Sequence, residues 1–378
     1  MSDLIVTAAV ARAPHTDFSI ETVGLDAPRP DEVLVRIVGV GVCHTDISTR
    51  DLQMVGLPAV FGHEGSGIVE EVGAEVRKVK PGDAVAISFR SCGTCKTCLC
   101  GRPSYCAQFI TLNFTGTRPD GTRAISKAGE AIASNFFGQS SFATYALTYE
   151  RNLVKVPTDL PLELLGPLGC GIQTGAGGIL RSLDCERGSS LVVLGGGSVG
   201  LSAVMGGAIR KCSPLIVVEP QAARRALALE LGATHTIDPQ AVSDLTVPLR
   251  EIAPAGLDYA FDTSGLPAVI QAAAASLGVQ GVLGLVGGPP SADSTFALPI
   301  MMVTGRGLTV RGIVEGDSDP DIFIPELLEY YRAGLFPFDK LIKTYAFEQI
   351  NQAIVDQHDG KVIKPVLLMP KWPGVQHS

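Results

Sequence analysis

The stretch 41–46, with the sequence GVCHTD, places a thiol, an imidazole, a hydroxyl and a carboxylate at four consecutive positions. A second imidazole, His63, follows the thiol of Cys43 by twenty residues, and a second thiol, Cys170, stands between glycines far downstream. Two thiolates and one imidazole form a zinc set that leaves a fourth position open for water or substrate. We therefore predict an open zinc site on these three residues.

Two acidic residues accompany the predicted ligands. Asp46 can hold an imidazole in one tautomer, as the outer partners of metal-bound histidines commonly do. Glu64 follows His63 directly and is expected close behind the metal. Zn²⁺ with two thiolates and a neutral imidazole is formally neutral, so it can bind an alcohol, lower the pKa of the alcohol and still let the alkoxide release a hydride.

A second metal site is predicted from cysteines at short spacing, in the pattern C-x2-C-x2-C-x7-C: Cys92, Cys95, Cys98 and Cys106. Four thiolates suit a closed, structural zinc site. The intervening residues are polar or small and form no core, so the metal is expected to hold this lobe together. Cys100 is an additional cysteine, expected to be a free thiol, with the role of an alternative ligand as the competing interpretation.

A glycine-rich loop follows a predicted strand at 191–194 and precedes a predicted helix at 198–210. Its glycines fit the pattern G-x-G-x-x-G in the context that dinucleotide binding requires. Gly195 would allow the tight turn, Gly197 the close approach of a pyrophosphate, and Gly200 the packing of helix on strand.

The acid Glu219 ends the next predicted strand, 215–218. An acid at this point accepts hydrogen bonds from the adenosine ribose and repels a 2′-phosphate, which favours NAD over NADP. Arg224 and Arg225 follow closely and could hold a 2′-phosphate, which is an argument for NADP.

Two kinds of domain are expected around these sites. Residues 4–90 alternate short apolar runs with glycine and proline, which is typical of a mainly β unit. From about residue 170, apolar strands alternate with helices, which predicts an α/β class with a parallel, doubly wound sheet. The expected strands are 191–194, 215–218, 234–237, 259–262, 282–286 and 308–313, and the expected helices are 198–210, 222–231 and 267–277. Helices near 325–333 and 347–357 and a strand at 362–368 should follow.

Composition argues against several classes of protein. The 378 residues are 46% hydrophobic, enough for a large core, and the net charge of −8 without a Lys/Arg run argues against a nucleic-acid partner. Without a long apolar span or a leader sequence, we expect a cytoplasmic chain with no membrane partner. Nine unevenly placed cysteines favour metal ligation over a disulfide framework.

These motifs together resemble the zinc-dependent medium-chain alcohol dehydrogenases over nearly the whole chain. The resemblance is carried by GVCHTD at 41–46, GHEGSG at 62–67, the four-cysteine lobe, GCGIQTG at 169–175 and GGGSVG at 195–200. Within this family, FFGQSSFATYAL at 136–147 and LLGPLGCGIQTGAG at 164–177 look most similar to the aryl-alcohol (benzyl alcohol) dehydrogenases.

The resemblance implies a GroES-like β-rich catalytic domain over residues 1–169, completed by residues 311–378, and a Rossmann NAD-binding domain over residues 170–310. It also implies two zinc ions per chain, one catalytic and one structural. In the family, an edge strand such as 308–313 pairs with its copy in a second subunit, so a homodimer or homotetramer is expected.

The resemblance assigns roles to further residues. Thr45 would take the alcohol proton and pass it to the nicotinamide ribose, and Thr174 would touch the nicotinamide. His44 would lie by the cofactor pyrophosphate, and Lys364 would supply a phosphate-binding cation. Phe89 would form an aromatic wall of the substrate pocket, with ordinary core packing as the alternative.

Ser48 departs from the family pattern, because much of the family has a histidine there that ends a proton relay. The proton must then leave through water or through His44.

The expected function is the reversible oxidation of a primary aromatic alcohol to its aldehyde with NAD. The alternatives are a dehydrogenase for allylic or terpenoid alcohols such as geraniol or perillyl alcohol, a glutathione-dependent formaldehyde dehydrogenase, and a non-catalytic NAD-binding or zinc-storage protein. The last alternative requires an incomplete open site, whereas its three ligands and Thr45 are all present.

Overall fold

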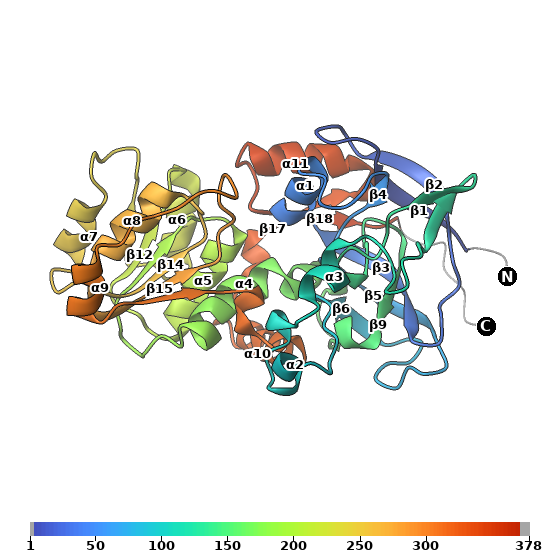
Figure 1. Cartoon of the computed structure of the whole chain (residues 1–378), viewed down its shortest axis with the longest axis horizontal. Helices are drawn as coiled ribbons and strands as arrows, with labels where there is room; N and C mark the ends of the chain where they lie inside the picture. Colours follow the sequence, from blue (N-terminus) through green and yellow to red (C-terminus); the bar gives the residue numbers. More distant parts are fainter. Residues whose placement is uncertain (1–3, 371–378) are drawn as a thin grey trace. The chain divides into compact units, whose positions relative to one another are not determined.

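A computed structural model describes residues 4–370, which form two compact units (Figure 1). The first unit runs to Cys170 and resumes at Ile342, and the second is Gly171–Leu341. The second unit therefore extends beyond the expected boundary at residue 310. The extension contains helix α10 (Pro320–Arg332), which packs on helix α4 (Gly171–Gly177) and buries four of its apolar side chains, Phe323, Ile324, Leu327 and Leu328.

The first unit is built on two sheets. The strands of one sheet are β1 (Leu4–Ala11), β2 (Ser19–Leu25), β4 (Ala59–Val60), β7 (Ile125–Lys127) and β8 (Glu130–Ile132), in the order β4-β1-β2-β7-β8. The strands of the other are β3 (Glu32–Gly41), β5 (Gly65–Val72), β6 (Ala84–Ile87), β9 (Tyr145–Tyr149), β10 (Leu153–Lys155), β17 (Ile342–Ala346) and β18 (Lys364–Leu368), in the order β10-β6-β5-β3-β18-β17, with β9 also paired to β3. Neighbours are antiparallel except β17 and β18.

Segments far apart in sequence complete this unit. Strand β18 pairs with β3, with Leu367 opposite Val40, so this late strand lies beside one of the early strands (Figure 1). The helices are α1 (His44–Asp51), α2 (Lys96–Leu99), α3 (Phe109–Phe114) and α11 (Ile350–His358). A single apolar cluster with members from both parts of the chain forms the core.

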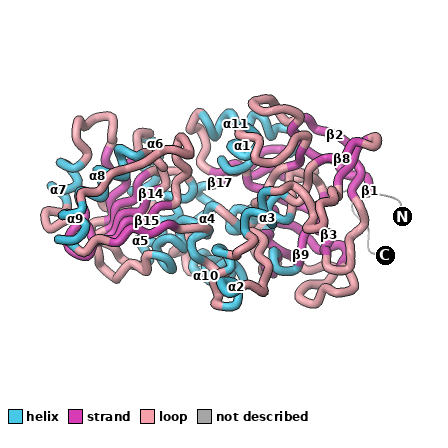
Figure 2. The backbone as a smooth tube through the Cα atoms, in the orientation of Figure 1, coloured by secondary structure: helices cyan, strands magenta, loops and turns pink. Residues whose placement is uncertain are grey.

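The second unit is built on a parallel six-stranded sheet. Its strands are β11 (Leu191–Leu194), β12 (Leu215–Val218), β13 (His235–Ile237), β14 (Leu257–Asp262), β15 (Leu277–Leu285) and β16 (Thr309–Gly312), in the order β13-β12-β11-β14-β15-β16. Further helices are α5 (Ser198–Ile209), α6 (Ala222–Glu230), α7 (Thr246–Ile252), α8 (Pro267–Ala275) and α9 (Ile300–Arg306). Figures 1 and 2 show α5 and α8 on opposite sides of the strands. The predicted fold class is confirmed.

The central strands explain why the sequence predicted this sheet well. All residues of β11 and β12 are buried, as expected of strands covered on both faces, and such strands appear in sequence as continuous apolar runs. The short helices α7 and α9 were not predicted, because seven residues carry too little periodicity to mark a helix.

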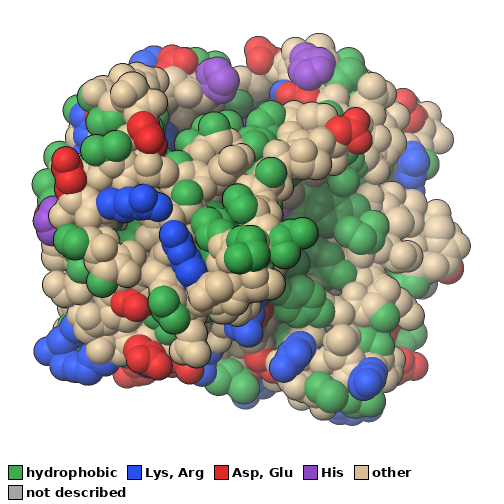
Figure 3. Space-filling view, turned by 60° about the vertical axis from the view of Figure 1, so that its left-hand side comes forward, with side chains coloured by type: hydrophobic (Ala, Val, Ile, Leu, Met, Phe, Trp, Pro, Cys, Tyr) green, Lys and Arg blue, Asp and Glu red, His purple; other side chains and the backbone are tan. Residues whose placement is uncertain are grey.

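Among residues 4–370, no helix is both long enough and apolar enough to cross a membrane. On the face drawn in Figure 3, acidic and basic side chains are interspersed rather than gathered by sign.

Candidate metal and cofactor sites

The first predicted ligand, Cys43, lies where strand β3 ends and helix α1 begins. Strand β3 is rich in β-branched residues, which favour extended backbone, and nearly all of it is buried. Cys43 is the N-cap of α1. The Asp46 carboxylate, in the first turn of that helix, accepts a hydrogen bond from the Cys43 main-chain N–H at 3.0 Å. The thiol is therefore held at a defined strand-to-helix junction.

Asp46 also holds the second ligand. Its Oδ1 accepts from the main-chain N–H of Gly62 at 3.0 Å and lies 2.8 Å from Nδ1 of His63. Both side chains are fully buried, so water does not compete for the contact. A carboxylate on one ring nitrogen directs the other nitrogen toward a metal. Asp46 thus stands in the outer position expected from the sequence.

The predicted ligands meet in space. His63 Nε2 is buried and bonds to no described group. Cys43, Cys170 and Glu64 each offer an atom within 4.8 Å of a His63 ring nitrogen and of one another. A hydrogen bond with Cys170 lowers the pKa of Cys43 well below its usual range, which favours the metal-binding thiolate. A buried, unpartnered nitrogen beside two sulfurs fits a zinc ion.

Glu64 already has a partner within the protein. Nζ of Lys364 donates to both Glu64 carboxylate oxygens at 2.8 Å and to the Val42 carbonyl at 3.2 Å. Burial raises the pKa of Glu64, and the Lys364 ammonium opposes the rise. Gly41 makes room for this carboxylate, because a Cβ there would lie 2.0 Å from Glu64 Oε2. Lys364 is buried and its ammonium is engaged by Glu64, so the phosphate-binding role implied by the resemblance stays a prediction.

The residues expected around the reacting alcohol lie on or near α1 and the aromatic core. The Thr45 hydroxyl is half-buried, 3.7 Å from Cys43 Sγ, whereas the His44 side chain is exposed. The Ser48 hydroxyl donates to the Thr45 carbonyl at 3.4 Å. Phe89 is buried, with its ring centroid 5.8 Å from that of Phe109.

Aromatic rings also pack on His63, and these were not singled out individually from the sequence. The Phe137 ring is stacked on the imidazole with centroids 4.5 Å apart, and the Phe136 ring meets it edge-on at 5.5 Å. Phe109 and Phe114 extend the same cluster. Of these rings, only Phe136 and Phe137 could have been suspected from the sequence, because they are adjacent in FFGQSSF.

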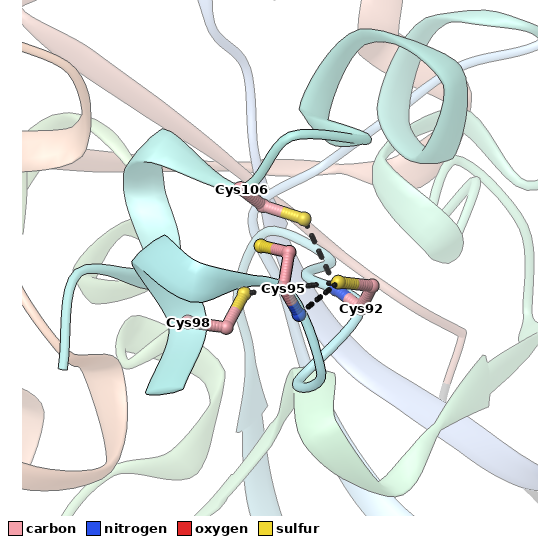
Figure 4. A group of neighbouring side chains, drawn as sticks. All are labelled: Cys92, Cys95, Cys98 and Cys106. Atoms are coloured by element: carbon pink, nitrogen blue, oxygen red, sulfur yellow. Dashed lines mark hydrogen bonds between the residues drawn. The ribbon is translucent and has the colours of Figure 1, made fainter. Parts of the chain in front are cut away.

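The four-cysteine lobe forms a second metal-binding group (Figure 4). The Cys92 main-chain N–H donates to Cys106 Sγ at 3.2 Å, and the Cys95 N–H donates to Cys92 Sγ at 3.3 Å. The Thr97 hydroxyl, together with backbone N–H groups, lowers the pKa of Cys95 to about 5. Sulfurs held by N–H donors suit the four thiolates of a closed zinc site. Cys100 is exposed and lies outside this group.

In the second unit, the glycine loop joins β11 to α5 as expected. Gly195 has a φ of +103°, which favours glycine, and a Cβ on Gly200 would lie 1.9 Å from the Gly195 carbonyl oxygen. A Cβ on Gly197 would meet no described atom within 4 Å, so this side of the loop is open. The loop therefore combines a tight turn, close helix packing and room for a phosphate.

Glu219 follows β12 and faces the glycine loop. Its carboxylate accepts hydrogen bonds from the main-chain N–H groups of Gly196 at 2.6 Å and Gln221 at 2.9 Å. Arg225 donates to the Glu219 carbonyl at 2.8 Å and pairs with Asp238 at 3.1 Å, so its guanidinium is already occupied. Arg224 is half-buried, and its Nε has no described partner.

Thr174, the expected nicotinamide contact, lies in α4. Its hydroxyl donates to Oε2 of Glu315 at 3.3 Å, and Gln173 donates to the same oxygen at 3.4 Å. Glu315 is buried and has a φ of +51°. The Thr174 hydroxyl is therefore oriented by Glu315, a residue that no sequence motif indicated.

Comparison with known proteins identifies the family. Residues 29–158 match the alcohol dehydrogenase GroES-like domain, and residues 198–329 match the zinc-binding dehydrogenase domain. The geraniol dehydrogenase of Castellaniella defragrans is 51% identical over 362 residues, which cover 96% of this chain and 97% of that protein. The chain belongs to the medium-chain zinc-dependent alcohol dehydrogenase family. The family recognised from the motifs is thereby confirmed.

Two solved structures of this kind share the fold. The benzyl alcohol dehydrogenase of Acinetobacter calcoaceticus is 42% identical, with a TM-score of 0.93 and coverage of 97% of this chain and 100% of that chain. An alcohol dehydrogenase zinc-binding domain protein from Burkholderia ambifaria is 49% identical, with a TM-score of 0.94 and coverage of 97% and 99%. A GroES-like domain joined to a Rossmann-like domain is therefore the architecture of this chain.

Proposed function

We propose that this dehydrogenase uses NAD to interconvert an aldehyde and a primary alcohol whose hydroxyl-bearing carbon adjoins an aromatic ring or a carbon–carbon double bond. The observation that carries the proposal is the set of aromatic rings packed against the zinc ligand His63. Phe137 and Phe136 contact this imidazole directly, and Phe109 contacts Phe137. Phe136 and Phe137 are buried, whereas Phe109 is half-buried, so Phe109 is the ring of this set against which a flat, unsaturated group would pack.

The relatives support both forms of this substrate class. One is a geraniol dehydrogenase and the other a benzyl alcohol dehydrogenase, at 51% and 42% identity respectively. Geraniol is an allylic alcohol and benzyl alcohol an aromatic one, and both carry the hydroxyl one carbon from an unsaturated carbon. The benzyl-type alcohol predicted from the sequence and the terpenoid alternative are thus two members of one proposed class.

Residues of the chain itself would supply the groups that the proposed reaction needs. A zinc ion on Cys43, His63 and Cys170 would supply the Lewis acid that lowers the pKa of the alcohol. Asp46 fixes the His63 ring through Nδ1. We infer that the Thr45 hydroxyl, 3.7 Å from Cys43 Sγ, accepts the alcohol proton and passes it on. The Ser48 hydroxyl bonds back to the Thr45 carbonyl, so the proton leaves through water or the exposed His44.

NAD is the proposed cofactor because the Glu219 carboxylate follows β12 beside the glycine loop, where an acid disfavours a 2′-phosphate. Glu219 is held at the glycine loop by Gly196, and Arg225 is engaged with its own neighbours. Negative charge at this point repels the additional phosphate of NADP.

The test is a substrate panel with zinc-loaded enzyme and both cofactors. Benzyl alcohol, geraniol, cyclohexylmethanol and ethanol should be compared by kcat/KM. We expect the two unsaturated alcohols to exceed cyclohexylmethanol by about tenfold, which is about 1.4 kcal/mol of transition-state stabilisation. NAD should exceed NADP by at least about tenfold, and Glu219→Ala should reduce that preference. Equal rates with cyclohexylmethanol, or a requirement for glutathione with formaldehyde as the better substrate, would contradict the proposal.

A further inference from the structure

The segment from Asn135 to Ser140 has unusual backbone geometry. Asn135, Phe137 and Ser140 have φ values of +64°, +51° and +55° respectively. Asparagine tolerates the left-handed region, but a bulky side chain such as phenylalanine rarely adopts it. This backbone conformation costs free energy, so it is found only where surrounding contacts enforce it.

Several buried hydrogen bonds enforce it here. Asn152 Nδ2 donates to the Phe137 carbonyl at 3.0 Å, and the Gly138 N–H donates to the Asn135 carbonyl at 2.8 Å. The Ser140 hydroxyl accepts from the Phe136 N–H at 3.0 Å. The segment is therefore rigidly defined on both sides of Phe137.

The segment is also tied directly to the backbone around His63. Gln139 is buried, and its Nε2 donates to the His63 carbonyl at 2.9 Å. Its Oε1 accepts from the Gly65 N–H at 3.2 Å. The Gln139 side chain thus holds the residues on both sides of Glu64. It fixes the distance between the backbone at His63–Gly65 and the Phe137 segment.

The result of this geometry is the stack of Phe137 on His63. The ring centroids are 4.5 Å apart, and the ring planes differ by only 27°. Asp46 holds the imidazole at one atom, Nδ1, and a single hydrogen bond does not by itself define the tilt of the ring about that contact. A flat ring lying against the imidazole removes that freedom.

We propose that Phe137 is a positioning residue that sets the ring plane of His63, so that Nε2 faces the zinc ion held with Cys43 and Cys170. This role rests on the proposed zinc site. The left-handed backbone at Phe137 places its ring over the imidazole, and Asp46 and Phe137 together define the orientation of the ligand. Phe137 acts through His63 and is not itself a ligand.

The test compares Phe137→Leu with the matched control Phe114→Leu. Phe114 belongs to the same aromatic cluster and contacts Phe137 and Phe136, with ring centroids 5.0 and 5.8 Å away. The two substitutions remove the same volume, but only one removes the ring stacked on His63. Phe137→Tyr restores a stackable ring. Should Phe137→Leu yield no folded protein, Phe137→Met makes the same comparison.

Two readouts follow the metal rather than turnover. The first is the rate of zinc release from each holoenzyme to a chelator, in which the four-cysteine zinc serves as an internal reference. The second is the visible absorption spectrum after Co²⁺ replaces the open-site zinc, because that spectrum depends on ligand geometry.

We expect Phe137→Leu to release one of its two zinc ions about tenfold faster or more, with the other unchanged, and to alter the Co²⁺ spectrum. Phe114→Leu and Phe137→Tyr should match the wild type in both readouts. Equal release and spectra in Phe137→Leu and Phe114→Leu would overturn the positioning role while leaving the zinc site intact. A wild-type enzyme that binds only the four-cysteine zinc would overturn the site and this role together.

Discussion

At the scale of single residues, Glu64 and Lys364 form a buried ion pair in which each charge offsets the other. The residues are 300 positions apart, and both side chains are almost inaccessible to solvent, at 0% and 2% exposure. Taking two charges out of water costs several kcal/mol each, which their attraction offsets only while both are present. Beside a metal site, the pair also keeps the carboxylate in a defined place.

Removing one partner should therefore cost more than removing both. We expect Lys364→Met to lower the free energy of unfolding by about 3–5 kcal/mol, because the buried Glu64 carboxylate loses the ammonium that donates to both of its oxygens. The double variant Glu64→Gln/Lys364→Met should recover a large part of that loss. Urea unfolding of zinc-saturated protein measures both. Additive losses in the double variant would show that the two side chains are not coupled.

A second prediction at this scale concerns Thr45. Thr45→Val keeps the shape of the side chain but removes the hydroxyl beside Cys43, so we expect kcat for alcohol oxidation to fall by about 10²-fold or more. Thr45→Ser should retain most of the rate. His44→Arg should reduce kcat much less than Thr45→Val, because the exposed His44 lies where water can replace it. A Thr45→Val enzyme with wild-type kcat would show that the proton takes another route.

At the scale of elements, the four-cysteine lobe illustrates a loop with little core of its own. Helix α2, which lies within it, has no buried residue. Its organisation therefore depends on the cysteines and on the N–H donors that surround them. Metal binding to such a lobe contributes folding free energy directly.

Two zinc ions per chain are expected, with separable effects. Cys95→Ser should remove the lobe zinc and lower the thermal midpoint, because the lobe loses its main support. Cys43→Ser should remove the other zinc and nearly all activity while the fold remains. Elemental analysis, circular dichroism and thermal unfolding of both variants measure these effects. Active, fully loaded enzyme with a single zinc per chain would refute the two-site assignment.

The hairpin of β1 and β2 carries a pH-dependent ion pair. Arg12 holds the pKa of Glu21 at about 2, below its ordinary value of 4.5, and Lys127 adds to this effect. A lowered carboxyl pKa stabilises the fold above about pH 4.5, and that contribution is lost as the pH falls toward 2.

Glu21→Gln should therefore lower the thermal midpoint at pH 7, and its difference from the wild type should shrink as the pH is lowered from 4.5 toward 2. Glu130→Gln is the matched control, since Glu130 also pairs with Arg12 but its side chain is 50% exposed. We expect a smaller effect there. A Glu21→Gln difference that is the same at pH 7 and pH 3 would contradict the lowered pKa.

At the scale of the whole molecule, one edge of the parallel sheet is suited to a second copy of the chain. Strand β16 is the last in the sheet, and all four of its residues are exposed. Large apolar side chains are exposed on β15, α9 and β16: Val279 at 76%, Ile300 at 78%, Met301 at 82% and Val310 at 44%. An exposed apolar edge strand favours association with another strand.

We therefore expect a homodimer, or a tetramer built from such dimers, joined through β16. Val310→Lys combined with Met301→Glu should yield monomers, because charges on this edge oppose its pairing. Light scattering after size-exclusion chromatography measures the mass. Substitution of Leu52 and Met54, which are exposed at 73% and 53% in the first unit, is the control and should leave the mass unchanged. A wild-type monomer, or a dimer unaffected by the double substitution, would refute this interface.

The sequence by itself determined the residue sets and the kind of fold. Metal ligation and phosphate binding require particular residue types at short spacing, so Cys92–Cys106, Gly195–Gly200 and Glu219 could be selected without coordinates. Buried parallel strands are continuous apolar runs, so β11 and β12 were predicted with their bounds.

Tertiary structure alone decided how these groups are held. Asp46 links Cys43, three residues before it, to His63, seventeen residues after it, and Lys364 neutralises Glu64 across 300 positions. The left-handed backbone at Phe137 carries no sequence signature, because the buried contacts around it enforce that conformation against the local preference of phenylalanine. The second unit likewise ends at Leu341 through the packing of α10. Residue type and spacing indicate which chemistry a site can perform. The orientation of its side chains depends on which distant residues fold against each other.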